Sequence, residues 1–224
     1  MSELSFEDYL RNLRDHPDEG VRANAAWRLG RTRDHRCLQA LLDAVHDPSP
    51  VVRARVMEAL GSRREPEVVP AIAQGLDDPD ADVRAMAARA AALAASTELT
   101  PRLFDLLDDP AERVVEEAIQ ALAYSEHHEV GPRLVSQLRQ QAENDTLRYF
   151  LRQALKRRGG AETLEAARAL MSDAAAPSAI LCDLLEVLAS MRTSDADIRA
   201  AVNALVDHPD EAVREMAQWA LSQL

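Results

Sequence analysis

The 224-residue sequence has few aromatic residues, few glycines and only two cysteines. Eight aromatics and seven glycines suit helices better than sheets and their tight turns. Cys37 and Cys182 cannot form a disulfide framework, which is typical of a reducing compartment. No apolar run approaches the roughly 18 residues of a membrane span, and the first residues do not resemble a signal peptide. We therefore expect a cytoplasmic protein that does not enter the membrane.

Positive charge is also scarce. The net charge is −12 at pH 7, and Lys156 is the only lysine. Because nucleic acids and anionic membranes bind cationic surfaces, this charge argues against both as partners. The chain is 47% hydrophobic and 29% charged. That composition is sufficient for a folded core and excludes a disordered tail.

One short phrase recurs along the whole chain. It reads Asp-His-Pro-Asp-Glu-Gly-Val-Arg at 15–22 and Asp-His-Pro-Asp-Glu-Ala-Val-Arg at 207–214, with related copies between them. Its proline stands at positions 17, 48, 79, 110 and 209, and two degenerate copies have their equivalent positions at 143 and 176. The repeat therefore predicts a single domain over residues 1–224, with repeats starting near 1, 32, 63, 96, 126, 159 and 193.

Each copy is predicted to be two helices joined by this turn. With the turn proline counted as position zero, apolar residues occupy positions +4, +8 and +12, which lie on one face of the second helix. Position +1 offers side chains that can cap the start of that helix, namely Asp18, Ser49, Asp80, Asn144 and Asp210. A lone helix pair cannot bury its apolar face, so the pairs must stack on one another.

The turn motif Asp-x-Pro-x-x-x-Val-Arg, the helix end Ala59-Leu60-Gly61 and the helix start Val-Pro-Ala-Ile at 69–72 resemble HEAT repeats. More narrowly, they resemble the short HEAT-like repeats of the phycobilisome lyase family. The resemblance implies an all-α fold, a right-handed α-solenoid of about seven two-helix repeats. It also implies that the second helices line a concave, partner-binding face.

Motifs for catalysis or metal binding are poor. The densest cluster, His127-His128-Glu129, has no second histidine one helical turn away, as a zinc motif of the HExxH type requires. A solvated turn is the better interpretation. His16, His46 and His208 recur in one turn, which indicates a local structural role. We therefore expect no catalytic residue, no metal site and no cofactor.

An arginine recurs at position +5, as Arg22, Arg53, Arg84, Arg148 and Arg214. The regularity could indicate a ligand site. HEAT-type stacks, however, commonly pair this arginine with acidic turn residues of the neighbouring repeat. We favour such an internal ladder, because Asp–Arg hydrogen bonds explain the pattern without a ligand.

The candidate partner-binding residues lie on the polar side of the second helices, where we expect positions +6, +10 and +13 to point away from the core. Position +10 carries Trp27 and Trp219 in the first and last repeats, which are either interaction hot spots or covers of the two ends. The fifth repeat places Arg148, Arg152 and Lys156 along one helix face. That stripe has two interpretations. It binds an acidic peptide, a phosphate or a bilin propionate, or it is a solvated basic face.

These observations lead to a non-enzymatic scaffold that binds another protein, or an acidic peptide, through its second helices. The predicted contact residues are Trp27, Arg89, Tyr149, Arg152, Gln153, Lys156 and Trp219. One alternative, implied by the resemblance, is a bilin lyase subunit or a chromophore-handling chaperone. Another is a HEAT-like DNA glycosylase, which the net charge of −12 argues against. The last repeat shows no obvious polar cap, which is compatible with self-association through it or with docking onto a missing neighbour.

Overall fold

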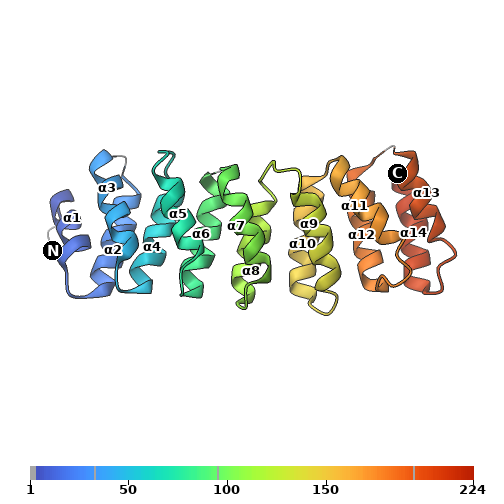
Figure 1. The fold of residues 1–224 in the computed structure, drawn as a ribbon, viewed down its shortest axis with the longest axis horizontal. Helices are drawn as coiled ribbons and strands as arrows, with labels where there is room; N and C mark the ends of the chain where they lie inside the picture. Colours follow the sequence, from blue (N-terminus) through green and yellow to red (C-terminus); the bar gives the residue numbers. More distant parts are fainter. Residues whose placement is uncertain (1–3, 33, 95, 194) are drawn as a thin grey trace. The chain divides into compact units, whose positions relative to one another are not determined.

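The computed structural model describes residues 4–32, 34–94, 96–193 and 195–224, and over these residues the chain is helical, without a strand (Figure 1). The α-helices are α1 (Phe6–Asp15), α2 (Glu19–Gly30), α3 (His35–Asp43), α4 (Pro50–Gly61), α5 (Val68–Leu76), α6 (Ala81–Ala94), α7 (Thr100–Asp105), α8 (Glu112–Leu122), α9 (Val130–Gln140), α10 (Asp145–Arg158), α11 (Ala161–Met171), α12 (Ser178–Met191), α13 (Ala196–Ala204) and α14 (Glu211–Gln223). Three 3-10 turns, η1 (Ala44–His46), η2 (Thr97–Leu99) and η3 (Leu106–Asp108), flank α3 and α7. The predicted all-α class with two helices per repeat is confirmed.

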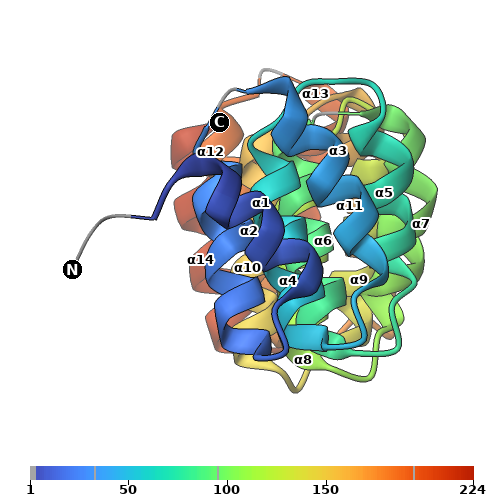
Figure 2. The ribbon, with the colours of Figure 1, turned by 90° about the vertical axis from the view of Figure 1, so that its left-hand side faces the viewer.

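The chain divides into two compact units, residues 1–125 and 126–224. The first unit contains four helix pairs. Its second helices, α2, α4, α6 and α8, pack against one another in order. In Figure 2 these helices lie on one side of the row, and the first helices α3, α5 and α7 lie on the other. The prediction of one domain over residues 1–224 stays a prediction.

The second unit contains three helix pairs. Its second helices α10, α12 and α14 pack in order, and its first helices α9, α11 and α13 do the same. Position +9 is buried in five earlier repeats, at Ala26, Met57, Ala88, Ile119 and Leu185. The last pair carries the exposed Gln218 there and the exposed Ser222 at +13. The expectations of an uncapped last repeat and of self-association through it stay predictions.

The core follows the predicted apolar stripe. Side chains at +4, +8 and +12 of the seven second helices are buried, except Val21 in the first pair and Leu221 in the last, which are half-buried. Among the capping residues, Asp18, Asp80, Asn144 and Asp210 accept backbone N–H groups of their helices. Ser49 does not cap α4, because its hydroxyl donates to Glu19 and Pro50 opens the helix instead. The sequence therefore specifies where each second helix begins.

Position +13 departs from the expectation that it faces away from the core. It is buried at Gly61, Ala123 and Ala189, and position +6 is buried at Ala23 and Ala85. The cause is the close approach of neighbouring second helices. A Cβ atom added to Gly61 would lie 3.0 Å from the Cα atom of Ala90 in α6. Position +10 is the more reliable marker of the outward face.

Candidate functional site

The outward face of the second helices carries the predicted contact residues, but in two separate groups. Trp27 on α2 and Arg89 on α6 belong to the first unit. The other five belong to the second unit, with Tyr149, Arg152, Gln153 and Lys156 on α10 and Trp219 on α14. Arg89 and Gln153 are exposed, and Tyr149 and Trp219 are 51% and 45% exposed. Within α10, Tyr149 and Gln153 stand one helical turn apart and form a small continuous surface.

The two tryptophans have different surroundings. Trp27 is half-buried, and the guanidinium carbons of Arg28 and Arg31 lie 5.2 Å and 5.0 Å from the centroid of its ring. Trp219 is more exposed, and no cation–π contact to it occurs within the described residues. Of the two, Trp219 is the better placed to contact another protein, because nearly half of its surface is free of intramolecular contacts.

The cationic stripe of α10 is paired with carboxylates of α12. Arg148 Nε lies 2.8 Å from Asp183 Oδ2, and Arg152 Nη1 lies 2.5 Å from Asp183 Oδ1. Lys156 Nζ lies 2.5 Å from Glu186 Oε1. The Asp183 side chain is only 3% exposed, so this network is partly buried between the two helices. The stripe is therefore neither a solvated basic face nor a set of unpaired cations.

The arginine at +5 forms a ladder in the first unit. Arg22 Nε and Nη2 donate to Asp47 at 2.8 and 2.9 Å, Arg53 donates to Asp78 at 2.7 and 2.8 Å, and Arg84 donates to Asp109 at 2.7 and 3.0 Å. In each rung Nη1 also donates to the two carbonyls of its own turn. Each arginine thus ties its own turn to the turn of the next repeat.

The second unit uses the same arginine differently. The carboxylate that completes a rung stands one residue before the turn proline, and the equivalent residue in the sixth repeat is Ala175. Arg148 pairs instead with Asp183 in α12. Arg214 donates through Nη1 to the carbonyls of His208 and Pro209. The geometry at Arg148 follows from the absence of a turn carboxylate.

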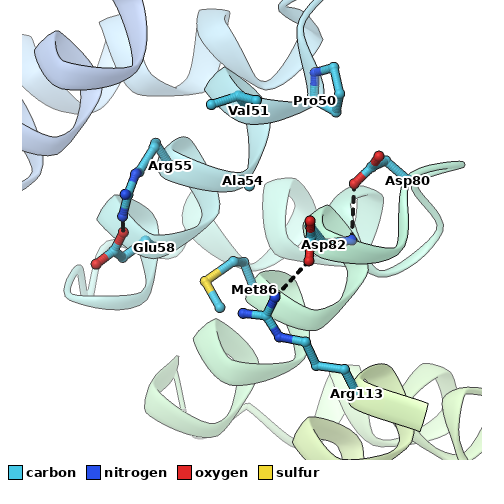
Figure 3. A pocket seen from close by; sticks show the side chains of 9 residues that line it. All are labelled: Pro50, Val51, Ala54, Arg55, Glu58, Asp80, Asp82, Met86 and Arg113. Carbon is cyan, nitrogen blue, oxygen red and sulfur yellow. Dashed lines mark hydrogen bonds and ion pairs between the residues drawn. The ribbon is translucent and has the colours of Figure 1, made fainter. Parts of the chain in front are cut away.

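A shallow groove on the outward face of the first unit was not anticipated from the sequence (Figure 3). It has a volume of about 310 Å³ and an apolar floor of Val51, Ala54 and Met86 from α4 and α6. Ion pairs flank it, with Arg55 and Glu58 on one side and Asp82 and Arg113 on the other, each with a 2.6 Å contact. Val51 is 50% exposed. In the sequence, the groove is indicated by Val51 at position +3 of the second repeat and by Met86 at position +7 of the third. Several other repeats have polar residues at these positions.

Cys182 and the adjacent histidines His127 and His128 are further chemically active groups. Burial raises the pKa of the Cys182 thiol, and the charges of Asp210 and Asp183 raise it further, so the thiol stays protonated at neutral pH. His127 and His128 stack with ring centroids 4.7 Å apart. Within the described part of the chain, no group of three or more His, Cys, Asp or Glu side chains could hold a metal ion.

The histidines of the repeated turn have structural partners. His16 Nδ1 and His208 Nδ1 each accept a backbone N–H from the residue two positions later, at 3.1 Å. His46 bonds instead to Gln74 at 3.0 Å. No helix in the described ranges is long and apolar enough to cross a membrane.

The amino-acid sequence also matches a family model. The model described as HEAT repeats matches residues 7–81 and 69–156. The chain belongs to the HEAT-repeat family. No curated protein sequence matches this HEAT-repeat chain.

Solved structures share the HEAT-repeat fold at low sequence identity. The complex of CpcE and CpcF of phycocyanin lyase from Nostoc sp. PCC7120 contains a chain with 20% identity and a TM-score of 0.63, covering 100% of this chain and 96% of that one. YibA of Escherichia coli has 20% identity and a TM-score of 0.61, covering 97% and 81%. The archaeal HEAT-like repeats protein from Thermococcus onnurineus NA1 has 15% identity and a TM-score of 0.53, covering 100% and 98%. At these identities the likeness concerns the fold.

Proposed function

We propose that this HEAT-repeat chain is a non-enzymatic scaffold that binds a protein partner through the outward face of its second helices. The observation that carries the proposal is the pair of half-exposed aromatic side chains, Tyr149 and Trp219, on second helices of the second unit. Exposed tyrosine and tryptophan supply large contact areas with few rotatable bonds, and they dominate the energetics of many interfaces. The free thiols of Cys37 and Cys182 support a reducing, cytoplasmic location.

The centre of the proposed interface is the surface of α10 around Tyr149. Its ring packs edge-on against Phe150, with centroids 5.6 Å apart, which limits its freedom before a partner arrives. Gln153 adds donors and acceptors beside it. Arg152 and Lys156 complete this surface. Both pair with Glu186, and the carboxylates of an acidic peptide would replace the Glu186 carboxylate in these ion pairs. In the first unit, Arg89, Trp27 and the groove over Val51 extend the same kind of face.

The test removes the exposed residues and leaves the ion pairs intact. The variant Tyr149→Ala/Gln153→Ala should lose capture of its stoichiometric partner from native extract while keeping its helical circular dichroism. Tyr124→Ala is the matched control, because Tyr124 is 56% exposed but lies outside the proposed surface. Capture that survives the double substitution would exclude α10 as the interface, and capture lost equally in both variants would show that it is not specific to this surface.

The acidic-peptide form of the proposal has its own test. Replacing Glu186 with Gln removes the carboxylate that competes for Lys156 and Arg152. If the partner is acidic, this variant should bind it more tightly than the wild type does. Unchanged or weaker binding would exclude an acidic peptide as the partner. The partner would then be a protein that contacts mainly Tyr149 and its neighbours.

The bilin-handling alternative rests on the family resemblance. A bilin lyase subunit or chromophore chaperone would shift the absorbance of an added bilin when the protein is present at micromolar concentration. The same measurement with Tyr149→Ala/Gln153→Ala locates any such binding. An unchanged spectrum would remove this alternative.

A further inference from the structure

A pocket of about 370 Å³ lies at the edge of the first helix pair, between the start of α1 and the end of α2. Its apolar wall consists of Leu4, Phe6 and Leu29, with Tyr9 beside them. Its cationic wall consists of Arg28 and Arg31, which are both exposed. The volume falls within the range of small-molecule pockets, roughly 300–1,000 Å³.

The two arginines differ from most others because no carboxylate among the described residues pairs with them. Neither side chain forms a hydrogen bond or an ion pair with any residue that the structure describes. Each guanidinium instead lies about 5 Å from the centroid of the Trp27 ring. A guanidinium that stacks on an aromatic ring keeps its N–H donors in its own plane, so the donors stay available to an anion.

Position +11 shows that this cationic wall is particular to the first pair. The equivalent residues of the other six repeats are small and buried, namely Ala59, Ala90, Ala121, Ala154, Val187 and Ala220. Arg28 is exposed at the same position. The helix dipole favours a cation at the end of α2, but it does not account for a second arginine beside the same ring or for the apolar wall opposite.

We infer that this pocket binds a small ligand with a phosphate or carboxylate group on an apolar or aromatic body. The anionic group would accept N–H donors of Arg28 and Arg31, with the bidentate geometry that guanidinium offers to such groups. The apolar body would pack against Leu4, which is 49% exposed, and Phe6. This inference shares only Trp27 with the proposed partner interface, whose centre lies on α10 in the second unit.

The probe for this site is phenyl phosphate, titrated into the full chain at about 0.15 M salt, where long-range repulsion by the acidic protein is screened. The two indole N–H signals of Trp27 and Trp219 in the NMR spectrum report binding, and the variant Trp219→Phe assigns them. The Trp27 signal should shift saturably, with a dissociation constant of about 1 mM for a ligand of this size. The Trp219 signal serves as an internal control and should not move.

Variants and related probes separate a built site from general attraction. Arg28→Ala/Arg31→Ala should weaken phenyl phosphate binding about tenfold or more, and the exposed Arg168→Ala should not change it. Benzoate should bind, phenol should not, and inorganic phosphate should bind more weakly than phenyl phosphate. Unfolding curves of each variant confirm that it is folded. The inference is overturned if Trp27 does not shift at 10 mM probe, if both tryptophans shift alike, if the double variant binds undiminished, or if inorganic phosphate binds equally well.

Discussion

At the scale of single residues, the arginine at +5 and the aspartate before the next turn proline depend on each other. Arg22, Arg53 and Arg84 each hold such an aspartate with two parallel hydrogen bonds. The fourth repeat has Val115 in place of the arginine, and the fifth has Ala142 in place of the aspartate. Both halves of a rung are therefore missing there, whereas Arg148 of the fifth repeat keeps the arginine, has Ala175 where the aspartate would stand, and pairs with Asp183 instead. A buried charge without its partner is costly, so an incomplete rung would destabilise the stack.

This dependence predicts the effect of breaking one rung. Arg53→Ala should lower the free energy of unfolding by about 2–4 kcal/mol, because Asp78 is only 10% exposed and would keep its charge without the arginine that pairs with it. Arg113→Ala is the control, since its ion pair with Asp82 is exposed and worth about 0.5 kcal/mol or less. Urea unfolding of both variants measures the difference. Equal losses would mean that the ladder does not stabilise the first unit.

The same rung predicts a dependence of stability on pH. Burial alone would raise the pKa of Asp78, but hydrogen bonds from Arg53, the backbone N–H of Asp80 and the charges of Arg53 and Arg84 together lower it below the ordinary 3.8. A lowered folded-state pKa means that the stabilisation is present above the ordinary pKa and is lost as the pH falls through the folded value. The unfolding free energy should therefore decrease below about pH 4.

Asp78→Asn provides the comparison for that pH profile. The variant is less stable at neutral pH, but its unfolding free energy should change less between pH 5 and pH 2 than that of the wild type, since one titrating group is gone. Urea midpoints across this range check the expectation. Parallel profiles for the two proteins would show that Asp78 does not contribute.

At the scale of the helix, the close packing of α2 against α4 depends on Gly30. A Cβ atom at Gly30 would lie 2.5 Å from the Cβ atom of Ala59 and 2.9 Å from its Cα atom, so the helices would have to separate. Gly30→Ala should cost about 1–3 kcal/mol, although alanine favours helix more than glycine does. The thermal unfolding midpoint measures the loss.

Gly20→Ala is the control for that substitution. The new Cβ atom would meet only the side chain of Asp18 on its own helix, at 3.1 Å. Its effect should be small, because no neighbouring helix has to move. If both substitutions destabilise the protein to the same degree, helix separation is not the cause.

The helices were the most predictable elements, for a physical reason that applies to each repeat. The apolar stripe at +4, +8 and +12 recurs in every repeat, mostly with a period of 31 residues, so each copy independently predicts the same second helix. Of the 21 stripe positions, 19 are buried. Val21 and Leu221 are half-buried because they belong to the first and last pairs. Ser49 shows the limit of local prediction: it suits a cap by residue type, but Glu19 of the preceding repeat holds its hydroxyl.

At the scale of the whole molecule, the two units differ in the contacts that their +5 arginines make. Stability in repeat proteins sums contributions from each repeat and from each interface between neighbours. Because Arg–Asp rungs join the repeats of the first unit, and Arg148 and Arg214 make other contacts within the second, the two units should unfold at different urea concentrations. The variants Trp27→Phe and Trp219→Phe each leave one tryptophan, and their fluorescence follows the second and first units respectively. Coincident midpoints from the two variants would show a single cooperative transition.

The candidate site was less predictable than the fold. The sequence placed Tyr149, Gln153 and Trp219 on the outward side of second helices, and the structure finds them exposed there. The pairing of Arg152 and Lys156 with Asp183 and Glu186 spans about one repeat in sequence and depends on which positions of α10 and α12 face each other. A helical wheel of one helix does not contain that information. The groove over Val51 and Met86 likewise requires two adjacent helices.

The spacing of the ladder has a consequence for how the chain folds as it is synthesised. Each rung joins residues 25 positions apart, so Arg22 cannot bind Asp47 until the following first helix has been made. Contacts of such short range allow rapid folding, because little loop entropy is lost in forming them. The first three helix pairs of the first unit are therefore each stabilised by a rung to the pair that follows. If the ribosome paused within one repeat, the preceding helix pair would be formed but would lack its Arg–Asp rung.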